Sequence, residues 1–391
     1  MAHIVWIQNK NSNDKQAKVV YEIKTLDGSR KRKSKTFPAK TAMREINKFK
    51  RDVETKYEES EGVDCTKQTV SQFLDVYFKT YEHTLSPTTY KNYHQMANAK
   101  EHGIKKHLGD IDIKKLKTIH VQKYANYLVD EGLSAKTVKN HIMMVHAVYD
   151  KAMKLHMVPS KYNIVSGVEL PKVKRKQIQS YSEEEVRKLL EIARRDANDM
   201  MYLEILLAVG TGCRRAELAA IKIDSIDFKN KVLHITQSKV KNIKGEEVLK
   251  SPKTSAGVRD IPLGEELLKE LRHAVNRYNK NKLKYGSDFV DSGFIFSNED
   301  GTPRKTSTMS SSFTKFMKAH EDEIRYLSLH SAGRHSFASI AIAQGTDIKA
   351  VQELLGHLDA TTTLNTYANS YNKVKVAYAT KLNELLVAKE A

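Results

Sequence analysis

A basic, proline-led segment at residues 171–176 constrains the fold most, because the hydrophobic pattern differs on its two sides. It begins with Pro171 and carries no apolar stripe, which is typical of a linker between domains. Its basic side chains are Lys172, Lys174, Arg175 and Lys176. The chain has 391 residues, too many for one ordinary domain. We therefore predict several domains, with a linker over residues 169–177.

The first 60 residues predict a small sheet covered by a helix. Val19, Tyr21 and Ile23 alternate with polar residues, and Asp27-Gly28 then indicates a hairpin turn. The third strand would contain the basic residues Arg30, Lys31, Arg32, Lys33 and Lys35. Apolar positions over residues 41–57 step by three and four, as on one face of a helix. Residues 1–62 are predicted to form this domain.

The charge balance favours nucleic acid as a partner. The first 60 residues hold 15 Lys and Arg against 8 Asp and Glu, and the whole chain carries a formal charge of +19. No apolar run approaches the roughly 20 residues that a spanning helix needs, so we expect no membrane partner. We interpret the basic third strand as a phosphate-binding surface, although such charges also guard exposed strand edges against aggregation. The sequence does not begin like a secretion signal, which predicts a cytoplasmic protein.

Residues 66–168 predict an all-helical domain. Apolar positions three and four apart indicate helices over residues 69–81 and 118–130. Ser86 followed by Pro87 has the pattern of an N-cap with proline at the first helical position. Ser134 is predicted to cap a further helix with a long apolar stripe.

Residues 178–391 predict a mainly helical domain with a small antiparallel sheet, which makes the chain an α+β multidomain protein. Ser182 and Glu185 have the spacing of a capping box. Strand-like patterns occupy residues 232–236, 247–249 and 258–261, and helices are expected to resume at about residue 310. Cys65 and Cys213 fall in different predicted domains and no Cys/His cluster has zinc spacing, so we expect neither a disulfide nor a metal site.

Four separated strings carry residues suited to phosphate chemistry. Arg214 follows Gly210 and Gly212, which we expect to form a tight turn after an apolar helix. A guanidinium group can hold two phosphate oxygens at once and stays charged, although this string alone also fits a surface salt bridge. The later strings contain Arg334 within residues 329–339, His357 within 354–357 and Tyr367 within 362–368.

Taken in this order, with His357 ten residues before Tyr367, the strings resemble the tyrosine recombinase (phage integrase) family. The resemblance implies that Tyr367 attacks a DNA phosphate and forms a 3′-phosphotyrosyl bond, while Arg214 and Arg334 clamp that phosphate. His357 would complete the pocket as a donor. By the same resemblance Lys253 is the general acid that protonates the leaving oxygen, and Glu217 has a supporting role. Fixed cations around the phosphate lower the barrier, so neither ATP nor a metal cofactor is expected.

One position departs from the family pattern. The family places a histidine three residues before the second arginine, whereas His330 stands four residues before Arg334. Positions three and four back face similar directions on a helix, so a local bulge would let His330 reach the phosphate. Ser331 filling the slot and weakened chemistry are the alternatives. We also expect Gly333 to loosen the helix.

The resemblance implies an integrase of a temperate phage or conjugative transposon. It would act as a homotetramer on DNA and be associated with the bacterial nucleoid. Residues 1–62 would bind arm sites and residues 66–168 core sites, with an excisionase or DNA-bending protein as a further partner. A last helix over residues 372–388 is predicted to dock on a neighbouring subunit. A DNA-binding regulator that kept the fold and lost catalysis is the runner-up, and a metal-dependent nuclease and a topoisomerase are more distant alternatives.

Overall fold

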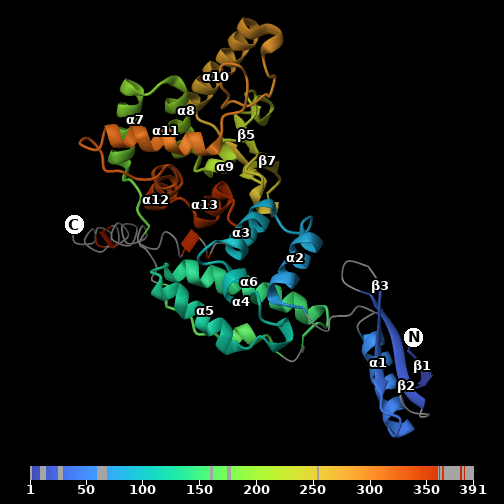
Figure 1. The fold of residues 1–391 in the computed structure, drawn as a ribbon. Helices are drawn as coiled ribbons and strands as arrows, with labels where there is room; N and C mark the ends of the chain where they lie inside the picture. Colours follow the sequence, from blue (N-terminus) through green and yellow to red (C-terminus); the bar gives the residue numbers. More distant parts are fainter. Residues whose placement is uncertain are drawn as a thin grey trace. The chain divides into compact units, whose positions relative to one another are not determined.

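The computed structural model describes residues 2–8, 15–24, 30–59, 68–158, 162–173, 178–252, 255–359, 361, 363–364, 379–380 and 383 (Figure 1). The chain divides into two compact units, Met1–Arg175 and Lys176–Ala391. Both units combine helices with small antiparallel sheets, as the predicted α+β class requires. No helix in the described ranges is long and apolar enough to cross a bilayer.

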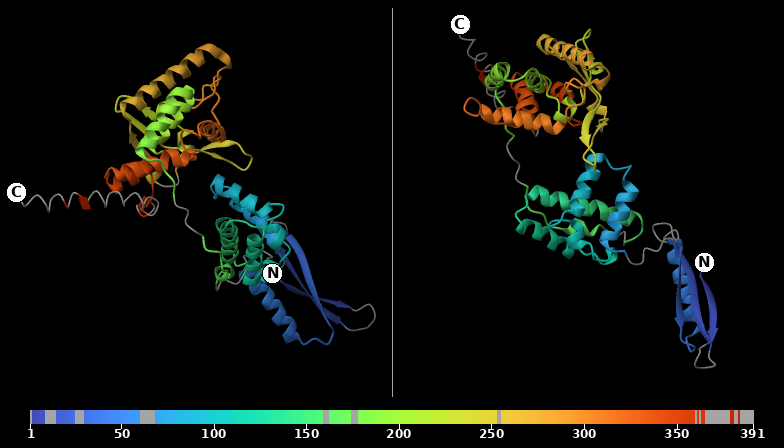
Figure 2. Two further views of the ribbon diagram at one scale, coloured as in Figure 1. Left: turned by 90° about the vertical axis from the view of Figure 1, so that its left-hand side faces the viewer. Right: turned by 45° about the horizontal axis from the view of Figure 1, so that its top comes forward.

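The first unit begins with one antiparallel sheet and a helix packed against it (Figures 1 and 2). The elements are β1 (His3–Gln8), β2 (Lys15–Lys24), β3 (Arg30–Phe37) and α1 (Met43–Glu59). Val19 on the central strand pairs with Ile4 and with Lys35, and its side chain is buried with Phe37 and Ile46. The basic stretch is therefore the third strand, as predicted. The expected turn at Asp27-Gly28 lies outside the described residues.

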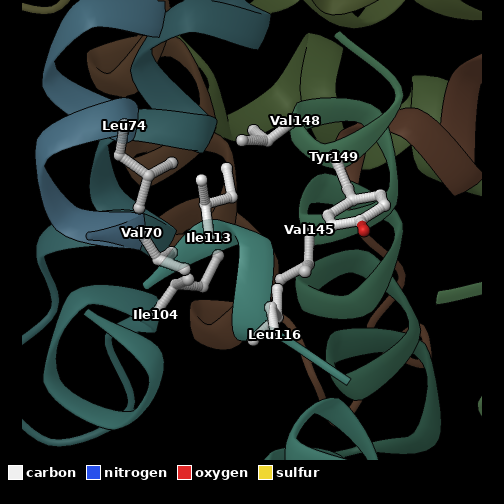
Figure 3. A pocket seen from close by; sticks show the side chains of 8 residues that line it. All are labelled: Val70, Leu74, Ile104, Ile113, Leu116, Val145, Val148 and Tyr149. Atoms are coloured by element: carbon white, nitrogen blue, oxygen red, sulfur yellow. The ribbon is translucent and has the colours of Figure 1, made fainter. Parts of the chain in front are cut away.

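The rest of the first unit is helical. Its helices are α2 (Val70–Tyr81), α3 (Pro87–Asn98), α4 (Ile104–Leu108), α5 (Thr118–Asp130) and α6 (Ala135–Lys154). Ser86 and Ser134 accept hydrogen bonds from the third backbone N–H of their helices, so both predicted caps are confirmed. The helices enclose a separate core with a small cavity lined by Leu74, Ile113, Val145 and neighbouring apolar side chains (Figure 3).

The second unit packs its helices around one central helix and carries two small sheets. Its helices are α7 (Glu183–Asp196), α8 (Asp199–Thr211), α9 (Arg215–Leu218), α10 (Glu265–Tyr285), α11 (Thr306–Ala319), α12 (Ser336–Ala343) and α13 (Ile348–Leu355), with the π-helical turn η6 (Ser331–His335) before α12. Its strands are β4 (Ile226–Asp227), β5 (Val232–Ile235), β6 (Ser238–Lys241), β7 (Glu247–Lys250) and β8 (Arg259–Pro262). The order β4-β5-β8 forms one sheet and β6-β7 a hairpin.

Helix α8 is the centre of this unit, because its sequence is apolar on every side. It contacts α7, α10, α11, α12 and η6, and most of its side chains are buried. Glu204 is an acidic residue among these apolar ones: it lies in the middle of α8 and is fully buried. Neither carboxyl oxygen of Glu204 has a hydrogen-bond partner in the described part of the chain. Burial raises the pKa of Glu204 to about 8, although the charges of Arg304 and Arg215 act in the opposite direction.

The predicted point at which helices resume after the strands was wrong. Helix α10 occupies residues that we left without an element, although Leu267, Leu271, Ala274 and Tyr278 are buried at helical spacing and two glutamates stand in its first turn. Helices therefore resume at Glu265 and not at about residue 310, close to which the next helix, α11, begins at Thr306. The capping box of Ser182 and Glu185 is confirmed.

Candidate active site

The end of α8 presents Arg214. Gly210 is still inside the helix, so only Gly212 makes the turn, with a φ of 61° that favours glycine. A Cβ atom on Gly212 would lie 2.6 Å from the ring of Phe337. Arg214 then caps the short helix α9. Its Nη1 donates to Glu217 Oε1 at 2.7 Å and its Nη2 to the carbonyl oxygen of Gly356 at 3.2 Å.

Glu217 joins Arg214 to a further arginine, Arg259, which the sequence did not lead us to predict as part of the site. Arg259 Nη2 donates to Glu217 Oε2 at 2.9 Å, and Arg259 Nε donates to the carbonyl oxygen of Leu354 at 2.6 Å. Burial alone would raise the pKa of Glu217, but the hydrogen bond and charge of Arg259, together with Arg214, hold that pKa below its ordinary value. The carboxylate therefore stays ionised and fixes both guanidinium groups.

Arg334 reaches the same place from the π turn η6, which packs on α8. Its side chain is almost wholly buried, with 3% of the residue exposed. Nη1 donates to the carbonyl oxygen of Gly212 at 3.0 Å, and Nη2 donates to that of Leu355 at 2.8 Å. Arg214 and Arg334 thus bind two successive carbonyl groups, those of Gly356 and Leu355. The three strings that carry Arg214, Arg334 and His357 converge here.

A π-helical turn absorbs the extra residue before Arg334. Ser331–His335 forms this turn, and the backbone N–H of Ser336 reaches the carbonyl oxygen of Ser331 five residues back. A π turn holds one residue more than an α turn, so a local bulge of the predicted kind is present next to Arg334. His330 is exposed, and its ring packs edge-to-face against that of His335, with the ring centres 4.6 Å apart. The surrounding protein, followed by the charges of Arg334 and Arg214, lowers the pKa of His330.

Gly333 has a packing role in this turn. A Cβ atom at this position would lie 2.7 Å from the Cβ of Ala208 and 2.9 Å from the carbonyl oxygen of Ala208. Glycine therefore lets the π turn approach the backbone of α8 closely.

His357 follows the C-terminus of α13 and points a ring nitrogen at a buried hydroxyl. Its Nδ1 lies 2.8 Å from Thr363 Oγ1, and its backbone carbonyl accepts from Gln352 Nε2 at 2.9 Å. Burial, followed by the charges of Arg334 and Arg214, lowers the pKa of His357 to about 4. The ring is therefore neutral at pH 7, and it would serve a phosphate as a hydrogen-bond donor and not as a cation.

Some predicted residues fall outside this description. Tyr367 and Lys253 lie outside the described residues, as do Lys174, Arg175 and Lys176, and so does most of the predicted last helix.

The predicted DNA-binding strand divides its basic side chains between two faces. Arg30 and Lys31 belong to β3, but their side chains are not described. Lys35 lies over the rings of Phe37 and Phe49, with Nζ 5.0 and 4.5 Å from the ring centres, so it faces α1. Arg32 lies on the opposite face of the strand by alternation. The other predicted contacts with a described side chain, Lys33 and Lys172, are exposed.

Two family patterns match the chain. Residues 179–373 match the phage integrase family, and residues 69–129 match the N-terminal SAM-like domain of phage integrases. Among curated relatives, a XerC-like tyrosine recombinase of Caldanaerobacter subterraneus is 29% identical over 315 residues, covering 76% of each chain. The ICEBs1 integrase of Bacillus subtilis is 24% identical over 377 residues, covering 95% of this chain and 97% of the relative.

Solved structures show the same fold. A Tn1549 transposon integrase in complex with transposon right end DNA matches with a TM-score of 0.66 and 22% identity, covering 80% of this chain and all of that chain. A lambda integrase dimer bound to a COC′ core site matches with a TM-score of 0.55 and 19% identity, covering 93% of this chain and 94% of that one.

Proposed function

This chain belongs to the phage integrase family of tyrosine recombinases, and we propose that it is a site-specific recombinase that cleaves and rejoins DNA to integrate and excise a mobile element. The observation that carries the proposal is the convergence of Arg214 and Arg334 on the carbonyl groups of Gly356 and Leu355, directly before His357. A phosphate clamp needs two arginines held at one point, and these come from distant parts of the sequence.

The charges around this point suit a phosphate in the transition state. Arg214 and Arg259 both bind the ionised carboxylate of Glu217, so these three groups together carry an excess of positive charge. Because these groups are fixed by buried hydrogen bonds, they need little rearrangement when negative charge grows on the phosphate oxygens. Arg214 uses two of the five N–H groups of its guanidinium in the contacts above, and 39% of its side chain is exposed to solvent. A phosphate can approach it from that side.

In the proposed reaction the hydroxyl oxygen of Tyr367 forms a bond to phosphorus, and the bond from phosphorus to the 5′-oxygen breaks. Lys253 donates a proton to that leaving oxygen, which a general acid of this kind accelerates by about 10²- to 10⁴-fold. The 3′-phosphotyrosyl ester keeps the energy of the broken linkage. The 5′-hydroxyl of another strand can therefore attack it, and the reaction proceeds without ATP or a metal ion.

The wider assignment also rests on the relatives. Their names include an integrase of the element ICEBs1, a transposase of transposon Tn916 and an integrase of Staphylococcus phage L54a, and several solved relatives are bound to DNA. We propose that residues 1–62 bind arm sites, 66–168 core sites, and 178–391 the cleavage site, with 169–177 as the linker. The assembly would be a homotetramer on bacterial DNA in the cytoplasm, joined by an excisionase or DNA-bending protein, with the last helix docked on a neighbouring subunit.

The covalent intermediate tests the proposed function. The full-length protein is mixed with a nicked suicide substrate, which traps the intermediate because the short cleaved strand diffuses away. We expect a protein–DNA adduct that survives denaturation and forms equally well in EDTA. Denaturing electrophoresis with labelled DNA measures it. Binding without any adduct would favour the regulator, and cleavage without an adduct that EDTA abolishes would favour a metal-dependent nuclease.

Replacing Arg214 with alanine should slow the formation of this adduct by about 10²- to 10³-fold, the usual effect of removing one donor to a developing oxyanion. The fold should persist because Glu217 keeps its bonds to Arg259. The matched control is Arg215→Ala, since Arg215 is exposed and its guanidinium contacts Ser310 on α11. At saturating DNA, equal single-turnover rates for the two variants would contradict the clamp.

A further inference from the structure

Ser336 is completely buried, and its hydroxyl joins two segments that are far apart in the sequence. The backbone N–H of Tyr181 donates to Ser336 Oγ at 2.8 Å. The same Oγ donates to the carbonyl oxygen of Ser331 at 3.0 Å. One hydroxyl thus acts as acceptor and donor at once, and a buried backbone N–H depends on it.

Ser331, which accepts the bond from the Ser336 hydroxyl, is the first residue of the π turn. The carbonyl oxygen of Ser331 also receives the backbone N–H of Ser336 across the i→i+5 step that defines a π turn. In an α-helical register this carbonyl would pair with residue 335, one position earlier, and Arg334 would turn relative to His330. The Ser336 hydroxyl therefore stabilises the register that sets the direction of Arg334 relative to His330.

The Tyr181 N–H, which donates to Ser336 Oγ, belongs to the segment that enters the second unit. Ser180 Oγ lies 3.1 Å from Ser339 Oγ, and Arg325 Nη2 donates to the carbonyl oxygen of Ser180 at 2.7 Å. The Tyr181 hydroxyl donates to the carbonyl oxygen of Arg325 at 2.5 Å. Ile178 and Gln179 line an open hollow together with Ser331 and His335 of the π turn. These bonds fix the entry segment to α12 and to Arg325, and of the bonds described here only that of the Tyr181 N–H reaches Ser336.

We propose that Ser336 is a positioning residue for strand cleavage: by bridging the Tyr181 N–H and the Ser331 carbonyl, it holds the π turn in the register that directs His330 and Arg334 at the phosphate. This inference rests on the proposed function, since it assigns a role in the same reaction. Ser336 itself does not touch the DNA. The entry segment, which directly follows the predicted linker, becomes part of the support of the phosphate clamp.

Two buried substitutions separate positioning from general weakening of the fold. Ser336→Ala removes the bridge, whereas Tyr181→Phe removes a nearby buried hydrogen bond, that of the phenol to Arg325, and keeps the N–H bond to Ser336. At saturating suicide substrate, Ser336→Ala should lower the single-turnover cleavage rate about ten-fold or more, because small displacements of reacting groups have large effects. DNA affinity should change by less than about two-fold. Tyr181→Phe should cleave at close to the normal rate, and Ser336→Thr, which keeps the hydroxyl, should restore most of the activity.

A second readout needs neither DNA nor activity. The pKa of His330 is lowered partly by Arg334 and Arg214, so a turn that changes register should move that pKa toward its ordinary value. Titration of labelled histidines by NMR in the full-length protein measures it, with His330→Gln to assign the resonance. We expect a rise in Ser336→Ala and none in Tyr181→Phe. If both variants change His330 and the cleavage rate alike, or if neither does, the positioning role is wrong. If even the wild-type protein forms no adduct, the proposed function fails, and the titration alone still decides the role of Ser336.

Discussion

Replacing Tyr367 with phenylalanine should abolish the covalent protein–DNA adduct while leaving DNA binding unchanged. Phenylalanine lacks the oxygen that forms the bond to phosphorus. The arginines that remain in the site are positively charged and cannot replace it as the nucleophile. The loss should exceed about 10⁴-fold, as for removal of a nucleophile in other covalent mechanisms. Single-turnover reactions with the suicide substrate measure the adduct, and a gel-shift titration at one fixed salt concentration measures binding.

The chain offers a matched control four residues away. Tyr371→Phe removes a phenol from the same stretch of sequence and should form the adduct at the normal rate. Protease digestion of the adduct followed by mass spectrometry should find the nucleotide on the peptide that contains Tyr367. An adduct that persists in Tyr367→Phe, or one that maps to Tyr371, would refute the assignment of the nucleophile.

Sequence patterns predicted the features that depend on neighbouring residues. Ser86, Ser134 and Ser182 cap helices because the side chain of a cap reaches only three residues ahead, so its partner can be read directly from the sequence. The alternation in the first strands has the same local origin. The order of the motifs also predicted that Arg214, Arg334 and His357 meet, and the structure brings all three together.

Other features depend on contacts between distant segments, and the sequence could not supply them. Gly333 was expected to weaken a helix, yet the approach of Ala208 on α8 makes glycine necessary there. The π turn was anticipated only as an unspecified bulge, because its stabilising partner, Tyr181, stands about 150 residues earlier. Arg259 did leave a local sign, since it shares the buried face of β8 with Ile261, where a charged residue needs a partner.

The stability of the second unit should fall as the pH rises through neutrality, and Glu204 is the cause. Its pKa in the folded protein is about 8, against an ordinary value of 4.5, because burial in α8 disfavours the charged form. The folded state therefore binds a proton that the unfolded chain releases above pH 4.5. The stabilisation linked to this proton is complete below pH 4.5 and is lost as the pH rises toward 8. The difference corresponds to about 5 kcal/mol at most.

Glu204→Gln should remove this pH dependence, because the amide has nearly the same shape and cannot ionise. Glu204→Leu should do the same and should raise the stability at pH 8.5 further, since it leaves no polar atom unpaired in the core. Hydrogen exchange of the α8 amides in the full-length protein, followed from pH 5 to pH 8.5 and corrected for the intrinsic rate, reports on this unit separately from the first. If the wild-type protein and Glu204→Gln show the same pH profile, then Arg215 or Arg304 must reach the ionised carboxylate, and Glu204 would be a paired charge instead of an isolated one.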